Sequence, residues 1–412
     1  MIFTSTYNAL AVKIDTLDED KEFIKDTIQK YFESYYETLK TGAYIDVANL
    51  FIDNEEAIIP QRILKNNLLL FKEFGRNYTF YELKIDFKDI EVNKDIARAE
   101  VIENAEFHYN TVPEDIISRI GNVQYVIELK KIDGNWKMSS IDSENNLDYE
   151  FVREQLKEYN NQISRQSKKQ YIENVFDEKD SYTKTLKNSL EKSLGTTPII
   201  EINDEDINTD DIILQGTYSY NIDRGIRYAR KYAYASKLSN SEKIFADCDP
   251  DCTNFVSQCI WAAYGGWDES SVTNSRNNVH NKVRMTSEWY GSKWGYGAFS
   301  NAWAGVPYLY NYVTKSKATG PNGYGYGEAS PRNFDLARVG RGDVIQLYNS
   351  SWGNWRHSLY VSYAYGKDPN DPIVLVCAHS GEARDEDIIK YLNKPNNTKV
   401  RGLYFSSGNF DK

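Results

Sequence analysis

The sequence has no long apolar segment and few of the residues that mark specialised protein classes. No run approaches the roughly 18 apolar residues that a membrane-spanning helix needs. Only 4 of the 412 residues are cysteine, which is too few for a disulfide scaffold. Lys and Arg number 49 against 60 Asp and Glu, for a net charge of −11. This balance argues against tracking along a nucleic-acid backbone, which needs a basic surface.

The N-terminus also lacks a secretory signal. Residues 1–13 have no basic start followed by an apolar block. The sequence therefore predicts either a cytoplasmic protein or a chain whose numbering begins on a mature or trimmed form. The length predicts two or three domains, and the mix of 41% hydrophobic and 26% charged residues is typical of globular proteins.

The first part of the chain has the pattern of a helix followed by an antiparallel sheet. Residues 17–40 carry apolar side chains at helical spacing. Four strand-like segments follow, with an Asp-Gly hairpin turn before the last of them: residues 80–87, 97–107, 123–129 and 136–141. The pattern and the ending KKIDGNWK resemble the nuclear-transport-factor-2-like (cystatin-like) cone. Residues 1–145 are assigned to this domain, in which no catalytic cluster stands out, so we expect it to serve targeting or docking of a protein partner.

A connector is predicted between this domain and the rest of the chain. Residues 146–195 are charge-rich and helical in pattern, and the acidic stretch 201–211 is predicted to be an exposed linker. We therefore assign residues 146–215 to the connector and residues 216–412 to a second domain. The expected fold class is α+β, with the nucleophile helix of the second domain packed on an antiparallel sheet.

Cys252 lies at the predicted start of a helix. Pro250 and Asp251 precede it, and the apolar residues that follow recur at helical spacing. The partial positive charge and free N–H groups of a helix N-terminus favour a thiolate, the nucleophilic form of cysteine. The alternative is that Cys252 is a small buried hydrophobic residue.

Metal binding explains this segment less well. Three aspartates at 247, 249 and 251 have the spacing of a calcium loop, but Cys252 stands where that loop needs glycine and Gln258 where it needs glutamate. The cysteines at 248, 252 and 259 lack zinc-site spacing, and only one histidine, at 280, is near. A disulfide between Cys248 and Cys259 stays open as an alternative.

A candidate base lies on a later strand. Residues 344–348, 357–363 and 373–380 are predicted strands, and the last two are joined by a turn-rich segment. A turn centred near Asp368 would pair His357 with His379, so that one imidazole orients the other. His108 and His280 are not predicted to pair with another histidine and are expected to be structural or surface residues.

The segment DCTNFVSQ at 251–258 resembles the signature of the putative amidase domain family of bacterial secreted proteins. The stretches 303–312 and 342–345 carry the same resemblance. That family is similar to the NlpC-like and CHAP cell-wall cysteine peptidases and has a papain-like fold. The resemblance covers about 190 residues, and the extra Cys248 ahead of the motif departs from it.

The resemblance implies a cysteine amidase with the set Cys252, His357 and His379. Cys252 would attack an amide carbonyl, its backbone N–H would bind the oxyanion, and Asp251 would cap the helix or contact the substrate amine. No metal or cofactor is implied. The implied substrate is an amide of bacterial peptidoglycan, in an extracellular or wall-associated setting.

Aromatic residues surround the predicted site. Trp303 and Trp355 are candidate substrate-binding residues. The aromatic insert between the motifs either walls the cleft or packs in the core, and packing is the more typical role: Trp289, Tyr290, Trp294, Tyr296 and Trp303. Two other functions stay open, a degenerate module that only binds the wall or a protein, and an acyl transferase that crosslinks amines.

Overall fold

The computed structural model describes residues 4–161, 167–194, 216–249, 251–295, 297–364, 373–379 and 381–411. The chain folds into two compact units. One contains residues 1–110 and 119–184, and the other contains residues 111–118 and 185–412. The predicted acidic linker at 201–211 lies outside the described residues. Within the described ranges, no helix is both long and apolar enough to cross a bilayer.

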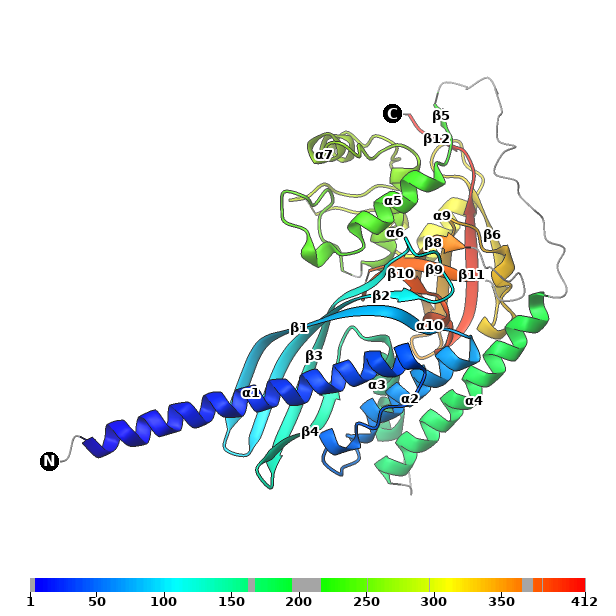
Figure 1. The fold of residues 1–412 in the computed structure, drawn as a ribbon. Helices are drawn as coiled ribbons and strands as arrows, with labels where there is room; N and C mark the ends of the chain where they lie inside the picture. The colour runs from blue at the N-terminus through cyan, green and yellow to red at the C-terminus, as the bar shows by residue number, and fades with distance from the viewer. Residues whose placement is uncertain are drawn as a thin grey trace. The chain divides into compact units, whose positions relative to one another are not determined.

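The N-terminal unit combines helices with one antiparallel sheet, as predicted. Its sheet has the strand order β1-β2-β3-β4, and the long helix α1 crosses these strands (Figure 1). Its elements are α1 (Thr4–Thr41), α2 (Ile58–Glu73), β1 (Tyr78–Asn93), β2 (Ile96–Tyr109), β3 (Ser118–Ile132), β4 (Asn135–Asp142), α3 (Leu147–Asn161) and α4 (Lys168–Leu194). Helix α2 has no counterpart in the sequence prediction.

The turn between β3 and β4 explains why this hairpin could be predicted. Ile132 pairs with Asn135, which leaves Asp133 and Gly134 as a two-residue loop. Both residues have positive φ, 48° and 80°, as a hairpin turn of the favoured twist requires. The apolar sides of α1 and the sheet then form one buried cluster that includes Ile24, Ile28 and Ile127.

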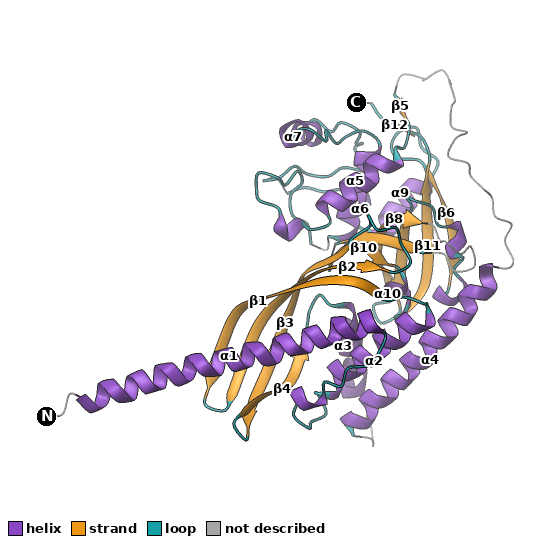
Figure 2. Cartoon of the chain, in the orientation of Figure 1, coloured by secondary structure: helices purple, strands orange, loops and turns teal. Residues whose placement is uncertain are grey.

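The C-terminal unit is built on antiparallel strands in the order β10-β9-β8-β7-β11-β6. Helices α5, α6 and α9 contact β8, a strand near the middle of this order (Figure 2). The elements of this unit are β5 (Thr217–Tyr218), α5 (Ile222–Tyr232), α6 (Cys252–Ala263), α7 (Val272–His280), α8 (Asn301–Ala304), α9 (Val306–Thr314), β6 (Gly323–Ala329), β7 (Val344–Asn349), β8 (Asn354–Ala364), β9 (Val374–Ala378), β10 (Glu382–Asp387), α10 (Ile389–Leu392), β11 (Asn397–Phe405) and β12 (Gly408–Asn409).

Close packing of α5 on the sheet depends on one glycine. A Cβ atom at Gly225 would lie 2.1 Å from the hydroxyl of Tyr360 on β8, so only glycine fits there. Asn221 begins α5 by accepting a hydrogen bond from the Arg224 N–H. The Cβ atom at Gly225 would lie 3.1 Å from that of Ala263 on α6, so α5 also lies against α6, and its last residue, Tyr232, takes part in the site described below.

Candidate active site

Helix α6 begins at Cys252, as its sequence predicts. All of its residues are buried, and Cys252 itself is 2% exposed. The apolar stripe led by Phe255 and Val256 lies in the main core of the C-terminal unit. Because this stripe must face the core, the first turn of α6 holds the thiol against the sheet.

The Cys252 thiol contacts the β8 backbone on both sides of His357. Its Sγ lies 3.6 Å from the carbonyl oxygen of Arg356, to which the S–H donates. Sγ also accepts a hydrogen bond from the Ser358 N–H and lies 3.7 Å from the hydroxyl of Thr253. Strand β9 ends at Ala378, so the sulfur occupies the edge of β8 at the level of the His357 backbone.

Burial favours the neutral thiol at Cys252 and so opposes the helix terminus, which is expected to favour the thiolate. Burial raises the pKa of Cys252, and the negative charge of Asp251 acts in the same direction. The hydrogen bonds from the Ser358 N–H and the Thr253 hydroxyl lower the pKa without cancelling the effect of burial. Forming the nucleophile at Cys252 therefore requires a base.

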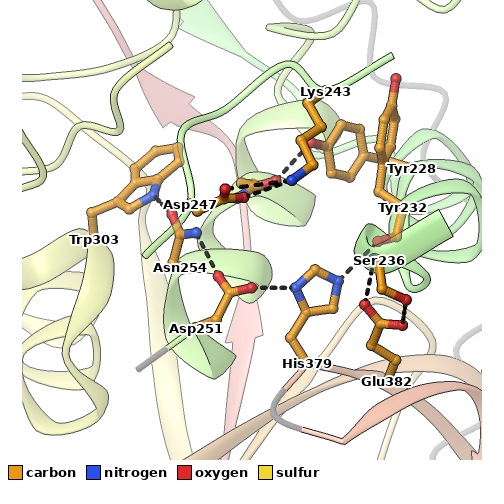
Figure 3. Close-up of polar contacts among 11 residues, drawn as sticks. Tyr228, Tyr232, Ser236, Lys243, Asp247, Asp251, Asn254, Trp303, His379 and Glu382 are labelled. Atoms are coloured by element: carbon orange, nitrogen blue, oxygen red, sulfur yellow. Dashed lines mark hydrogen bonds and ion pairs between the residues drawn. The ribbon is translucent and has the colours of Figure 1, made fainter. Parts of the chain in front are cut away.

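His379 is held between two hydrogen-bond acceptors (Figure 3). Its Nδ1 lies 2.6 Å from Oδ2 of Asp251, and its Nε2 lies 2.8 Å from the carbonyl oxygen of Tyr232. The ring stacks on Phe255, with 3.9 Å between ring centres. Only 5% of His379 is exposed, so these contacts fix both the place and the plane of its ring.

This environment makes His379 a cation. A carboxylate and a carbonyl can only accept hydrogen bonds, so each ring nitrogen must carry a proton to satisfy its partner. Burial alone would lower the pKa of His379, but the charge and hydrogen bond of Asp251 and the Tyr232 carbonyl outweigh it and raise the pKa above its usual value. A doubly protonated imidazole cannot accept the proton of Cys252.

The predicted pairing of His357 with His379 is wrong by one residue. The hairpin pairs Tyr360 with Cys377 and has a bulge at Ser362. Continued outward, this register places His379 opposite Ser358. His357 instead pairs with Leu347 on β7, and its ring stacks near Tyr391 of α10 at 5.7 Å. His379 therefore does not orient His357 in this structure.

Asp251 does not cap α6 with its side chain, which corrects a second expectation. Oδ2 bonds His379, and Oδ1 accepts a hydrogen bond of 2.6 Å from the Asn254 side chain. No backbone N–H of the first turn bonds the Asp251 carboxylate. The two side-chain partners use both oxygens, so Asp251 ties the start of α6 to His379.

Trp303 belongs to the core and is not open to a substrate. It is fully buried, and its indole N–H donates to Oδ1 of Asn254 at 2.7 Å (Figure 3). Trp289 of the aromatic insert is likewise fully buried. Trp355, the other candidate for substrate contact, is half-buried on β8 and stays available for that role.

A row of buried polar side chains runs across the sheet beneath the thiol. The Thr253 hydroxyl lies 3.1 Å from that of Ser358, and the Gln346 amide donates to Ser358 at 3.3 Å. Arg401 donates from Nε to Gln346 at 2.9 Å. Sequence patterns did not predict this row. Its one local signal is Gln346, a polar residue in the otherwise apolar strand VIQLY.

Cys248 lies near this site, since burial and then the charges of nearby groups, Asp251 and Cys252 among them, raise its pKa to about 11. His108 is in the N-terminal unit, with its Nδ1 2.7 Å from the Thr79 hydroxyl. His280 is the exposed last residue of α7. All four cysteines are free thiols, so Cys248 and Cys259 are not joined. Among the residues described, no three His, Cys, Asp or Glu side chains group as metal ligands would.

Comparison with solved structures gives likenesses to parts of the chain. The intermembrane space region of the chloroplast protein ARC6 is 13% identical, with a TM-score of 0.24, over 29% of this chain and 92% of that one. The Kfla4162 protein from Kribbella flavida is 13% identical, with a TM-score of 0.22, over 30% and 90% of the two chains. A putative scytalone dehydratase from Novosphingobium aromaticivorans is 16% identical, with a TM-score of 0.22, over 30% and 87%.

A family model matches most of the C-terminal unit. No curated protein matches the chain. Residues 219–403 match the family described as the putative amidase domain, and the match contains α6, β8 and β9 with Cys252, His357 and His379. This match supports an amide hydrolase at the family level for this part of the chain.

Proposed function

We propose that the C-terminal unit hydrolyses amide bonds of bacterial peptidoglycan, with Cys252 as nucleophile and His357 as general base. One observation carries the proposal: the buried thiol at the start of α6 contacts the β8 backbone on both sides of His357. The match to the amidase family supports the reaction class. The wall substrate follows from resemblance to cell-wall peptidases, and this function would place the protein at the cell wall.

His357 is the base in this proposal because His379 is already protonated. Both nitrogens of His379 bond acceptors, so it has no lone pair to offer. The other two histidines lie elsewhere, His108 in the N-terminal unit and His280 at the end of α7. His379 is then a positioning residue that holds Asp251 and, through it, the helix start beside the nucleophile.

The reaction follows from these roles. His357 takes the proton of Cys252, and the thiolate, held by the Ser358 N–H, attacks the amide carbonyl. The backbone N–H of Cys252, which has no partner within the helix, stabilises the oxyanion. His357 then gives its proton to the leaving amine. Water, deprotonated by His357, cleaves the thioester and restores the thiol.

The test is digestion of purified peptidoglycan by the full chain, with mass spectrometry of the released fragments. Wild type should release fragments with new amine and carboxylate ends, while Cys252→Ala and His357→Asn should release none. Cys248→Ser is the matched cysteine control and should keep wild-type activity, since Cys248 lies outside the proposed chemistry. Fragment release by Cys252→Ala would refute the mechanism.

Two further outcomes separate the alternatives. If wild type binds the wall and releases nothing, the unit is a binding module. If an added primary amine appears in the product in place of water, the enzyme is an acyl transferase. His379→Asn distinguishes the two histidines: it should retain measurable activity with a lower melting temperature, whereas a loss equal to that of His357→Asn in a folded protein would reassign the base.

A further inference from the structure

Arg401 on β11 is a buried cation held between two aromatic rings. It is 6% exposed, and its guanidinium lies 3.6 Å from the ring centre of Tyr310 and 3.8 Å from that of Trp355. Its Nε donates to Oε1 of Gln346 at 2.9 Å. Stacking of this kind fixes the plane of the guanidinium and leaves its edge to bind a partner.

The carboxylate of Glu328 acts on the charge of Arg401 from beyond ion-pair distance, and Glu328 itself pairs with Lys399 at 3.5 Å. The Nη2 of Arg401 is buried with no hydrogen-bond partner, and no carboxylate lies within ion-pair distance of it among the residues the structure describes. Burial lowers the pKa of Arg401 to about 10, so it stays charged near pH 7. A buried charge without a partner is costly, and proteins retain such groups where a ligand completes them.

Arg401 belongs to the polar row that ends at the nucleophile. It pairs with Gln346 on β7, which pairs with Ser358 on β8. Ser358 in turn donates its N–H to the Cys252 sulfur. Adjacent strands are about 4.8 Å apart, so the strands that carry Arg401 and Ser358 are about 10 Å apart.

The rings over the guanidinium border solvent. Tyr310 on α9 and Trp355 on β8 are both half-buried, so each ring that stacks on Arg401 is partly open to solvent. Near the thiol, the carbonyl of Arg356 contacts Sγ, and its exposed guanidinium stacks 3.8 Å from the ring centre of Trp352. The start of β8 thus carries positive charge in a protein of net charge −11.

We propose that Arg401 binds a carboxylate of the substrate, so that the amidase selects acidic peptides with a free carboxylate near the cleaved amide. This inference rests on the proposed function and names the substrate class of the same site. A planar carboxylate matches the flat edge of a stacked guanidinium and can take two hydrogen bonds from it. Arg401 is thus assigned to specificity and takes no part in proton transfer.

The test compares two probes on the full-length Cys252→Ala protein, which cannot turn them over. One is a peptidoglycan stem peptide with free carboxylates, and the other is the same peptide with these groups amidated. The free acid should bind at least about tenfold more tightly, the effect of one charge-assisted hydrogen bond. Adding Arg401→Gln should abolish the preference, and Arg401→Lys should keep part of it, because lysine retains the charge but not the fork.

A matched control and the melting temperature separate binding from folding. Arg338→Gln removes another arginine beside a tyrosine ring, that of Tyr326 at 5.7 Å, and should leave the preference intact. Equal binding of the two peptides by the parent, or a preference that survives Arg401→Gln, overturns the inference. Competition by inorganic phosphate at lower concentration than acetate would overturn the carboxylate assignment.

The outcomes also distinguish this inference from the proposed function. If wild type hydrolyses neither peptide while the binding preference depends on Arg401, only the proposed chemistry fails. If wild type hydrolyses both peptides with equal kcat/KM and Arg401→Gln changes nothing, the chemistry stands and the assignment of Arg401 fails.

Discussion

The imidazole of His379 and the carboxylate of Asp251 form a 2.6 Å ion pair one residue before the proposed nucleophile. The pair joins the end of β9 to the start of α6, two elements more than one hundred residues apart in sequence. His379 cannot relay protons while both its nitrogens donate. The pair therefore positions the residues of the site. Removing it should lower the melting temperature more than it lowers the catalytic rate.

Replacing Asp251 with Asn should lower the melting temperature in a pH-dependent way. The pKa of His379 is raised in the folded protein, so its stabilising contribution is full below the unfolded value of about 6.5 and is lost as pH rises through the folded value. We expect a loss of about 4–8 °C at pH 6, from one charge-assisted hydrogen bond, and a smaller loss at pH 9. A loss that grows with pH would contradict the assigned charge of His379.

Asp343→Asn should flatten the pH dependence of stability. Burial raises the pKa of Asp343 to about 7, against hydrogen bonds from the Tyr326 hydroxyl and the Gly340 N–H. The folded state thus favours the protonated carboxyl, and wild type should lose stability as pH rises from about 4 to about 7. The amide of Asn cannot ionise, so the stability of the variant relative to wild type should be higher at pH 8 than at pH 5. Thermal unfolding of wild type and of the variant between pH 4 and pH 8 measures both pH dependences.

Asn254→Ala should destabilise the C-terminal unit by about 1–3 kcal/mol, because it leaves the buried indole N–H of Trp303 without an acceptor. It also removes the donor to Asp251. The same change in a Trp303→Phe background should cost less, since the orphaned donor is then gone. Equal costs in the two backgrounds, measured by chemical denaturation, would show that the Trp303 contact contributes nothing.

In the N-terminal unit, Tyr36→Phe should lower stability by about 0.5–1.5 kcal/mol. The hydroxyls of Tyr36 and Tyr125 both donate to the buried carboxylate of Glu103 at 2.7 Å. Glu103→Ala should cost more, because it leaves two buried hydroxyls to find new partners. Tyr81→Phe is the matched control, since its 3.3 Å contact with Glu37 is partly exposed. Calorimetry should show the largest loss of stability for Glu103→Ala, a smaller loss for Tyr36→Phe and the smallest for Tyr81→Phe.

Local patterns predicted much of the fold because they depend on neighbouring residues. The apolar stripe after Cys252 predicts α6, and the Asp133-Gly134 pair predicts the β3–β4 hairpin, since each signal lies within a few residues of its result. Helix α2 was missed, as were the first residues of α1. The overall α+β class followed from the order of helical and strand-like patterns.

The site depended on information that sequence spacing does not carry. The register of β8 and β9, which includes the bulge at Ser362, places His379 opposite Ser358 and not opposite His357. Burial at Cys252 outweighs the helix terminus, and that balance requires the packed core. Arg401 joins the site only because β7 lies between β8 and β11. No pattern near Arg401 reveals this neighbour relation.

The polar row from Arg401 through Gln346 to Ser358 has a consequence for how the protein tolerates change. The alignment of these residues is set by hydrogen bonding between strands and does not depend on loop conformation. Lengthening the loops of this unit should therefore leave the distance between Arg401 and the Cys252 thiol unchanged. A shift of the β7 register by one residue would turn Gln346 to the other face of the sheet. Gln346 would then no longer connect Arg401 with Ser358, which contacts the Cys252 sulfur. Redesign for other amide substrates should therefore vary the side chain at position 401 and leave the strand pairing untouched.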